Sequence, residues 1–438
     1  MERGKEMNKK TIFVISILII LTPVSSVFGL NLKNQDQKDV RQSEFQKDIE
    51  SLLNMVNKSI ISYYLEKFVS FGYKKTGSEN ASRAAEWIKT EFENVGLYTY
   101  YDEWKFARYK DKNVIAIHNG TDASNDAVIL ISAHYDTIGN SPGANDDGSG
   151  IAAMLTIANL TKNINFNHTI RFIANSGEEE GTYGSFADAK KAYYKKENII
   201  AVLNIDMVGY ANESDKHLMQ IFSQERSKWI VEYTEDIADK YKNCFDLTPI
   251  YTNQYPADHE SYNDFGYDGI QYIEIKPEDA TWFHTPGDTL DKITYPYLVN
   301  ITKLVLAVAC ELANRPIHVQ VQITRPKEAY VYLFDIPIFK LPCYNLYYSK
   351  SRAITYIAGK TTVELNITTD EKIESVYFGI DGYMRHFVRE PPYKWKIGTE
   401  VFKFFPLYGY HRITVCVTTE TGKTATDEMD IYVLNHIR

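Results

Sequence analysis

The run VILISAHYD, at residues 128–136, is a short apolar segment that ends in histidine and aspartate. Its apolar part, Val128–Ala133, predicts a strand, and a helical pattern follows over about residues 150–160. A second apolar run, Thr169–Ala174, predicts another strand. Short strands that alternate with helices are typical of an α/β sheet with helices on both faces.

The same alternation extends in both directions along the chain. Amphipathic helical patterns precede it at residues 49–60 and 81–95, and Gly96 stands where the second helix would end. We therefore expect a mixed β-sheet sandwiched by helices over residues 45–315. The sequence predicts further strands at residues 113–118, 199–205 and 270–275, and further helices at about residues 185–194, 228–240 and 295–313.

The pattern changes at Arg315-Pro316. From that point, β-type runs such as Thr362–Ile367 and Arg412–Thr418 replace the helical period. We predict a separate all-β sandwich over residues 316–438. Three of its stretches resemble those of immunoglobulin-like modules, at residues 376–383, 391–393 and 408–411.

Residues 1–29 have the composition of a secretory signal peptide. Basic residues precede an apolar run from Ile12 to Leu21, and small residues lead to an expected cleavage site near Gly29. A retained membrane anchor is the alternative, but this run has about half of the ~20 apolar residues that span a bilayer. We expect a secreted or cell-surface protein with no membrane span after cleavage, and a polar segment at residues 30–44.

Charge and cysteine content narrow the class of protein. The 438 residues carry a formal net charge of -9 and show no cluster of lysine and arginine, so nucleic acid is not an expected partner. The cysteines are too few for a disulfide scaffold. Two disulfides and free buried thiols both remain open for Cys244, Cys310, Cys343 and Cys416.

Ionisable side chains recur at the ends of the predicted strands. His134 ends one strand and Asp146 lies in the loop after it. Glu179 and Asp206 follow the next two strands, and His284 follows the last. Because functional groups of open α/β sheets collect at the carboxyl edge, we expect these five side chains to meet there. Two imidazoles and three carboxylates are donors suited to zinc or a similar divalent ion.

Asp136 lies two residues after His134, on the same side of an extended backbone. We expect its carboxylate to accept the second imidazole N–H of His134 and so to orient the ring.

The chain from about Tyr64 to Leu312 resembles the secreted di-zinc aminopeptidases of bacteria and fungi, in the clan of glutamate carboxypeptidase II. The resemblance implies the fold of zinc-dependent exopeptidases. It also implies an activity that removes N-terminal residues from peptide or protein substrates. The matching stretches are SAHYD (132–136), GANDDGSG (143–150), GEE (177–179), NIDMVG (204–209), DH (258–259) and HTP (284–286).

The resemblance also implies a role for each ligand. Asp146 would bridge two zinc ions per chain, with His134 and Asp206 completing one site. Glu179 and His284 would complete the other site. A cis peptide bond is implied between Asp146 and the aspartate that follows it.

Glu178, directly before a ligand, matches the general base of this family. It would take a proton from the water shared by the two ions and later deliver it to the leaving amine. Neighbouring residues at a strand end point in different directions, so one glutamate can bind metal while the other faces the water.

Phe283 departs from the family pattern, because relatives often carry a tyrosine there whose hydroxyl helps to bind the oxyanion. Stabilisation of the oxyanion would then come from zinc or from another donor. Phe283 is a candidate substrate-binding residue, with ordinary core packing as the other interpretation. Asp258 is a second candidate in a predicted loop, where a surface turn explains it about as well.

Three other functions remain open on this scaffold. A carboxypeptidase is one, although the short connection at residues 106–113 leaves no room for the extra domain of that group. A glutaminyl cyclase, which uses one zinc, is the second. The third is a non-catalytic binding or adhesion ectodomain, which the complete ligand set disfavours. We expect the β domain to bind a surface or polymer, or to act as a stabilising cap.

Overall fold

The computed structural model describes residues 45–122, 126–195, 197–224, 227–252, 257–315, 319–341, 354–381, 383–397, 407–420 and 424–437. The expected signal peptide, the polar segment at residues 30–44 and Cys343 lie outside these residues. The chain divides into a unit of residues 1–54, whose described part is helical, and a unit of residues 55–438. The domain boundary at residues 315 and 316 stays a prediction.

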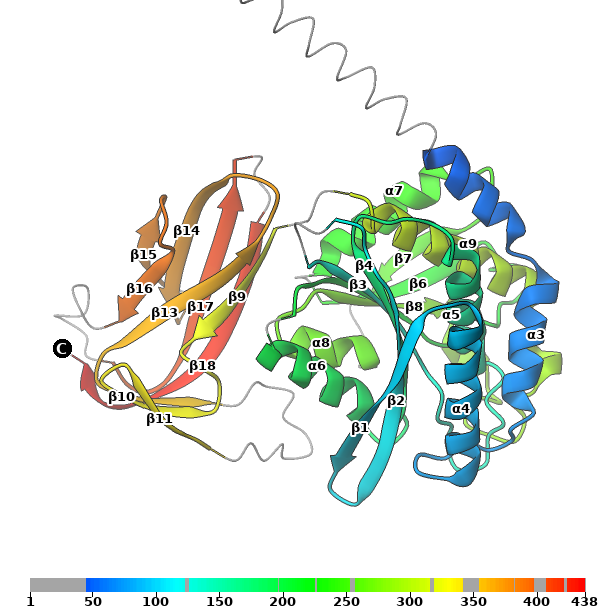
Figure 1. Cartoon of the computed structure of the whole chain (residues 1–438), viewed down its shortest axis with the longest axis horizontal. Helices are drawn as coiled ribbons and strands as arrows, with labels where there is room; N and C mark the ends of the chain where they lie inside the picture. Colours follow the sequence, from blue (N-terminus) through cyan, green and yellow to red (C-terminus); the bar gives the residue numbers. More distant parts are fainter. Residues whose placement is uncertain are drawn as a thin grey trace, which may run out of the picture. The chain divides into compact units, whose positions relative to one another are not determined.

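The larger unit contains a mixed eight-stranded sheet (Figure 1). Four central strands, β4, β3, β5 and β8, run parallel to one another, and β2 and β6 flank them in the antiparallel direction. Because parallel strands end at the same edge of a sheet, the segments after the four central strands gather there. The strands in spatial order are β1 (Tyr98–Phe106), β2 (Tyr109–His118), β4 (Thr169–Asn175), β3 (Val128–His134), β5 (Ile199–Ile205), β8 (Gly269–Glu274), β6 (Leu218–Ser223) and β7 (Thr248–Thr252).

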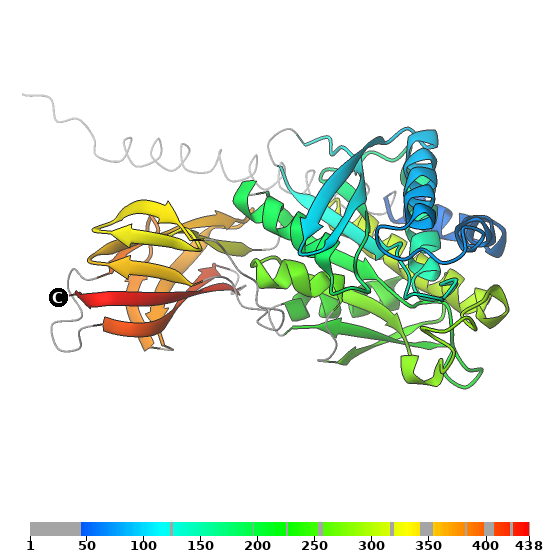
Figure 2. The ribbon, with the colours of Figure 1, turned by 90° about the horizontal axis from the view of Figure 1, so that it is seen from below.

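Helices cover both faces of this sheet (Figures 1 and 2). On one face, Tyr193 and Tyr262 pack with Leu130 and Val202 of the sheet into a buried core. The predicted α/β architecture with helices on both faces is therefore confirmed. That face carries α6 (Tyr183–Lys195) and α8 (Asp258–Asp264), and the other face carries α3 (Lys58–Val69), α4 (Glu79–Asn94), α5 (Gly148–Thr161) and α9 (Tyr295–Leu312), with α7 (Lys228–Lys240) packed against α9.

One predicted helix is wrong in its extent. The pattern at residues 49–60 is divided between a helix that ends at residue 55 and α3, which begins at Lys58. The side chain of Asn57 accepts the backbone N–H groups of Ser59 and Ile60, so it caps a new helix in the middle of the apolar repeat.

Every strand described after residue 319 belongs to one of two further sheets, as the predicted all-β region requires. Strands from both sheets contribute to one buried core, which includes Ile323, Phe378, Trp395 and Val415. The seven-stranded sheet has the order β11 (Ile336–Lys340), β10 (Tyr330–Leu333), β12 (Thr355–Ala358), β18 (Thr424–Ile437), β17 (Leu407–Thr419), β14 (Ile373–Ile380) and β15 (Tyr383–Val388), and the three-stranded sheet has the order β16 (Lys394–Ile397), β13 (Thr361–Thr368) and β9 (Gln320–Arg325).

Within the described residues, α9 is the one helix that is long and apolar enough to cross a membrane, but 67% of that stretch is buried inside the protein, as expected for a core helix. Cys244, Cys310 and Cys416 form no disulfide among the described residues.

Candidate metal centre

The five predicted ligands lie at one edge of the eight-stranded sheet. His134 is the last residue of β3, and Asp206 directly follows β5. Glu179 lies in the turn after β4, and Asp146 lies in the loop that leads into α5. His284 lies in the long segment between β8 and α9. The fold therefore brings together residues that are 150 positions apart in the sequence.

The first cluster forms around the imidazole of His134. Its Nδ1 lies 3.1 Å from the backbone oxygen of Asp136. A carbonyl oxygen only accepts hydrogen bonds, so Nδ1 carries a proton. In the neutral ring, the lone pair of Nε2 then faces Asp146 Oδ1 at 3.1 Å and Asp206 Oδ1 at 3.5 Å. A lone pair and two carboxylates repel one another, and a cation between them removes that repulsion. These side chains therefore fit a metal ion.

Burial and charge in this first cluster agree with that fit. His134 is 1% exposed and Asp206 is 7% exposed. Oδ1 of Asp206 is buried and accepts no hydrogen bond from the described residues. Burial lowers the pKa of His134, but the carboxylates of Asp136, Asp146 and Asp206 raise it more, so that the pKa lies well above its usual value. The cluster therefore attracts positive charge.

The second cluster shares Asp146 with the first. Nε2 of His284 lies 3.0 Å from Asp146 Oδ2 and 3.1 Å from Glu179 Oε2. The other oxygen of Glu179 accepts the backbone N–H of Ile138 at 2.9 Å, which fixes this carboxylate. His284 has a φ of 61°, a left-handed conformation that is uncommon for a residue with a Cβ atom. Asp146 thus presents one oxygen to each histidine.

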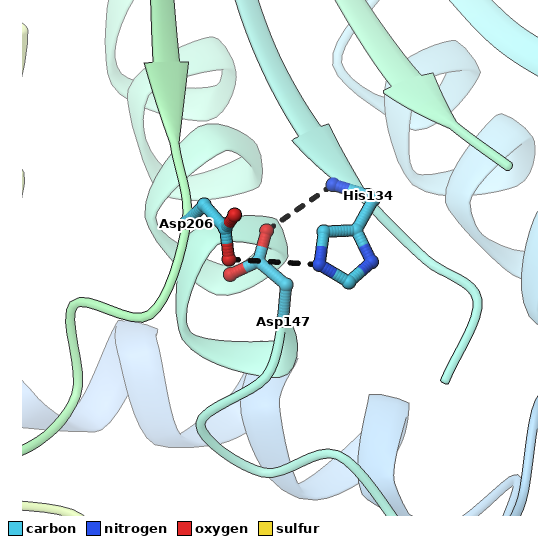
Figure 3. A group of neighbouring side chains, drawn as sticks. All are labelled: His134, Asp147 and Asp206. Atoms are coloured by element: carbon cyan, nitrogen blue, oxygen red, sulfur yellow. Dashed lines mark hydrogen bonds and ion pairs between the residues drawn. The ribbon is translucent and has the colours of Figure 1, made fainter. Parts of the chain in front are cut away.

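Asp147 is a further carboxylate beside the first cluster. Ligand atoms of His134, Asp147 and Asp206 lie within 4.8 Å of one another (Figure 3). However, Oδ2 of Asp147 accepts the backbone N–H of His134, and Oδ1 accepts that of Gly150 at the start of α5. Because both oxygens already bind backbone, we assign Asp147 to the support of the loop and Asp146 to the metal. The peptide bond between Asp146 and Asp147 is cis, as the family resemblance implied.

Asp136 acts differently from the expectation for its side chain. Its Oδ1 lies 3.8 Å from Nδ1 of His134, beyond hydrogen-bond distance, and its backbone oxygen takes that contact instead. The carboxylate accepts the backbone N–H groups of Glu178 at 3.2 Å and Glu179 at 3.3 Å, and the hydroxyl of Thr76 at 2.7 Å. Asp136 therefore orients His134 through the backbone and shapes the turn of the two glutamates through its side chain.

The carboxyl group of Glu178 lies in a strongly acidic environment. Burial raises its pKa, His134 lowers it, and Asp206, Asp258 and Glu179 raise it further, so that the pKa is well above its usual value. A carboxylate with a raised pKa is a stronger proton acceptor, which is the property that a general base needs near neutral pH.

The two candidate substrate residues have different surroundings. Phe283 packs against the buried residues Met207, Phe222 and Ile273, and its ring centroid lies 4.0 Å from that of His284. Asp258 lies in a helix and is buried, so the expected loop and the surface turn are both wrong, while its substrate-binding role stays a prediction. It is the first residue of α8, it is buried, and its Oδ2 accepts an N–H of Asn175 at 2.9 Å.

Three buried charged residues around the centre had no predicted role. Both oxygens of Glu274 lie 3.0 Å from Nδ2 of Asn145. Asp288 accepts the backbone N–H groups of two residues in the same loop. Nζ of Lys74 donates to the backbone oxygens of two loop residues. A signal existed for Glu274, which lies near the end of a predicted strand, and for Asp288, which follows His284 by four residues.

The fold and the paired clusters define an α/β domain with a candidate metal centre. Residues 113–309 match the model of peptidase family M28. The relatives and solved structures that this part of the chain resembles agree with that match. Several of these proteins are named as aminopeptidases, and some of their names include zinc.

Three comparisons illustrate the relationship. "Aminopeptidase YwaD" of Bacillus subtilis is 30% identical over 215 residues, which cover 48% of this chain and 46% of that protein. The chain thus spans about half the length of this relative. A "Probable zinc metalloprotease" of Pyricularia oryzae is 27% identical over 336 residues, with coverage of 61% and 67%. The crystal structure of LapB from Legionella pneumophila is similar with a TM-score of 0.57 and 26% identity, and covers 61% of this chain and 75% of LapB.

Proposed function

We propose that this protein is an exported exopeptidase that binds two zinc ions and hydrolyses the N-terminal peptide bond of peptides, with Glu178 as the general base. The observation that carries the proposal is the position of Asp146. Its two oxygens lie 3.1 Å and 3.0 Å from the imidazoles of His134 and His284, as a carboxylate that bridges two ions would. The names of the relatives support both zinc and aminopeptidase activity.

The residues of this chain divide the work of binding the ions. His134 and Asp206 would hold one ion, and Glu179 and His284 would hold the other, with Asp146 shared between them. Zinc in such a paired site polarises a carbonyl group and acidifies water. The protein contributes the fixed distances between these side chains and a buried, acidic environment that favours divalent cations.

The proton would move through Glu178. Its backbone N–H and that of Glu179 are both bound by Asp136, so the turn is rigid at this point. The two carboxylate oxygens of Glu179 contact the backbone N–H of Ile138 and the imidazole of His284. Glu178 is therefore the glutamate that can exchange a proton. A pKa raised by burial lets Glu178 accept a proton from the attacking water and return it to the leaving amine.

The N-terminal side chain of the substrate would bind beside Phe283. This ring, with Met207, Phe222 and Ile273, forms an apolar group directly next to two proposed ligands, Asp206 and His284. An apolar surface at this point favours substrates that begin with a large apolar residue. The function of the all-β region is a separate proposal, in which it binds a surface or a polymer.

The proposal is tested by metal content and by substrate. Purified protein should contain two zinc ions per chain by elemental analysis, cleave aminoacyl-coumarins, and lose activity with a chelator and regain it with zinc. Peptides with a blocked N-terminus should resist cleavage. The variant Asp146→Ala should bind fewer than two ions, and a wild-type zinc content in that variant would contradict the bridge.

The same assays separate the other functions. A carboxypeptidase would cleave the N-terminally blocked peptides. A glutaminyl cyclase would bind one zinc and convert N-terminal glutamine without releasing it. A non-catalytic ectodomain would bind metal and turn over none of these substrates. Each of these results would overturn the proposed aminopeptidase.

A further inference from the structure

Asp288 lies outside the proposed ligand set, yet it contacts the loop that carries Asp146. Its side chain is buried, with 0% of the residue exposed. Oδ1 accepts the backbone N–H of Asn145 at 2.8 Å, and Oδ2 accepts that of Asp146 at 3.0 Å. Its backbone oxygen accepts the N–H of Ala144 at 3.2 Å. One residue therefore binds three successive N–H groups that end at the proposed bridging carboxylate.

Asp288 is also linked to His284 through a short turn. The backbone N–H of Asp288 donates to the oxygen of Thr285 at 3.2 Å, and the hydroxyl oxygen of Thr285 accepts the N–H of Gly287 at 3.0 Å. Asp288 thus joins the segment of His284 to the segment of Asp146. These two segments must keep a fixed separation, because Nε2 of His284 and Oδ2 of Asp146 lie 3.0 Å apart.

Lys74 is a second buried residue that supports the loop of Asp146. It is held by the backbone oxygens of Gly72 at 2.8 Å and Pro142 at 2.7 Å. Pro142 belongs to the same loop as Asp146, so the loop is held at Pro142 as well as at Asn145 and Asp146.

We propose that Asp288 is a positioning residue that fixes Asp146 between the two metal sites and sets its distance to His284. The inference rests on the proposed two-zinc function of the same site. Residues that orient metal ligands typically contribute 10–100-fold to metal affinity or activity. Asp288 acts through the backbone of Asp146 and has no need to contact the substrate or the ions.

The test compares Asp288→Asn with wild-type protein in titrations of the metal-free form with zinc and with cobalt. The carboxamide keeps the shape of the side chain but offers one acceptor oxygen where two N–H groups need acceptors. We expect the wild type to bind two ions, and Asp288→Asn to bind one ion about 10–100-fold more weakly. The visible absorption spectrum of the bound cobalt should change, and kcat should fall more than KM rises.

A matched control is Asp188→Asn, because Asp188 is a buried carboxylate bound by Arg171 and Tyr262. It should retain the wild-type metal affinities and cobalt spectrum. Asp288→Glu keeps the charge and both acceptor oxygens but moves them by one methylene. It should also weaken one site, and it carries the test if Asp288→Asn fails to fold.

The outcomes separate this inference from the function on which it rests. If the wild type binds fewer than two ions, the proposed function fails whatever the variants do. If the wild type binds two ions, and a folded Asp288→Asn or Asp288→Glu binds both with the same constants and the same cobalt spectrum, the positioning role of Asp288 is wrong.

Discussion

Glu178 and Glu179 are adjacent in the sequence but occupy different environments at the scale of single residues. Asp136 binds both of their backbone N–H groups, so the turn is fixed while the two side chains diverge. Glu179 faces His284, whereas the charges of His134 and Asp206 act on Glu178. One carboxylate is thereby suited to hold a metal ion and its neighbour to exchange a proton.

The variant Glu178→Gln tests this division. A carboxamide has nearly the same shape as the carboxyl group but cannot accept the proton, so we expect kcat to fall by about 10²–10⁴-fold. The zinc content should stay at the wild-type value, because Glu178 is not among the proposed ligands. Steady-state kinetics and elemental analysis check both parts. A variant that retains wild-type kcat would exclude Glu178 as the base, and one that loses zinc would make it a ligand.

Phe283 offers a test of substrate preference. Its replacement by alanine removes apolar surface beside His284, so kcat/KM should fall by about 10-fold or more for substrates with N-terminal leucine or phenylalanine. Substrates with N-terminal alanine should lose much less. Phe387→Ala, at an exposed ring of β15, is the control and should change neither value. Equal losses for large and small residues would indicate that Phe283 serves packing alone.

At the scale of elements, the strands with strong apolar runs agree closely with prediction, and the weakly patterned elements were missed. The range of β5 is as predicted, because all seven of its residues are buried and apolar side chains dominate. β1 is an edge strand with a single buried residue, Trp104, and β7 contains Pro249 at the opposite edge. Neither offers the alternation that marks a half-buried strand. α8 has seven mostly polar residues, DHESYND, too few for a helical period.

Local sequence patterns predict only part of the centre. Strand ends revealed the five proposed ligands, because the carboxyl edge of a parallel sheet is a general rule. The contacts of Asp288 with Asn145 and Asp146 join residues more than 140 positions apart. No local pattern predicts such a contact, since it depends on how two loops meet in three dimensions.

Lys74 lies between α3 and α4 and gives a prediction on pH dependence. Burial lowers its pKa to about 7, against an ordinary value of 10.5, although Asp288 opposes this shift. Between pH 7 and 10.5 the unfolded chain therefore binds more protons at this residue than the folded chain does. The contribution of Lys74 to the free energy of unfolding must then rise with pH across that range.

The variant Lys74→Met keeps most of the apolar stem and removes this proton. The free energy of unfolding, measured with urea from pH 7 to 10.5, should rise less with pH than it does in the wild type. Lys216→Met, at an exposed lysine whose Nζ lies 2.7 Å from Glu213 Oε2, is the control and should keep the wild-type slope. An unchanged slope in Lys74→Met would show that Lys74 has an ordinary pKa in the folded protein.

At the scale of the whole molecule, the described residues form more than one hydrophobic core. Leu130, Val202 and Tyr262 belong to a core of the eight-stranded sheet, whereas Phe378, Trp395 and Val415 belong to the core of the all-β region. The proposed metal ligands are all carried by the eight-stranded sheet and its connecting segments. Metal binding should therefore be coupled to the stability of one core and not to that of the other.

Calorimetric unfolding with and without a chelator tests this coupling. A ligand that binds the folded state alone stabilises it by about 2.7 kcal/mol at 100 times its Kd, and 1 kcal/mol shifts the Tm of a domain of this size by about 2–4 °C. Removal of zinc should thus lower one transition by roughly 5–10 °C per site, because the buried carboxylates of the centre lose their counterion. The transition of the all-β core should stay at the same temperature.

The variant Asp146→Ala should respond less to the chelator than the wild type does, since it lacks the proposed bridge. Equal shifts of both transitions would mean that the two cores unfold as one, and the absence of any shift would contradict a structural role for the metal.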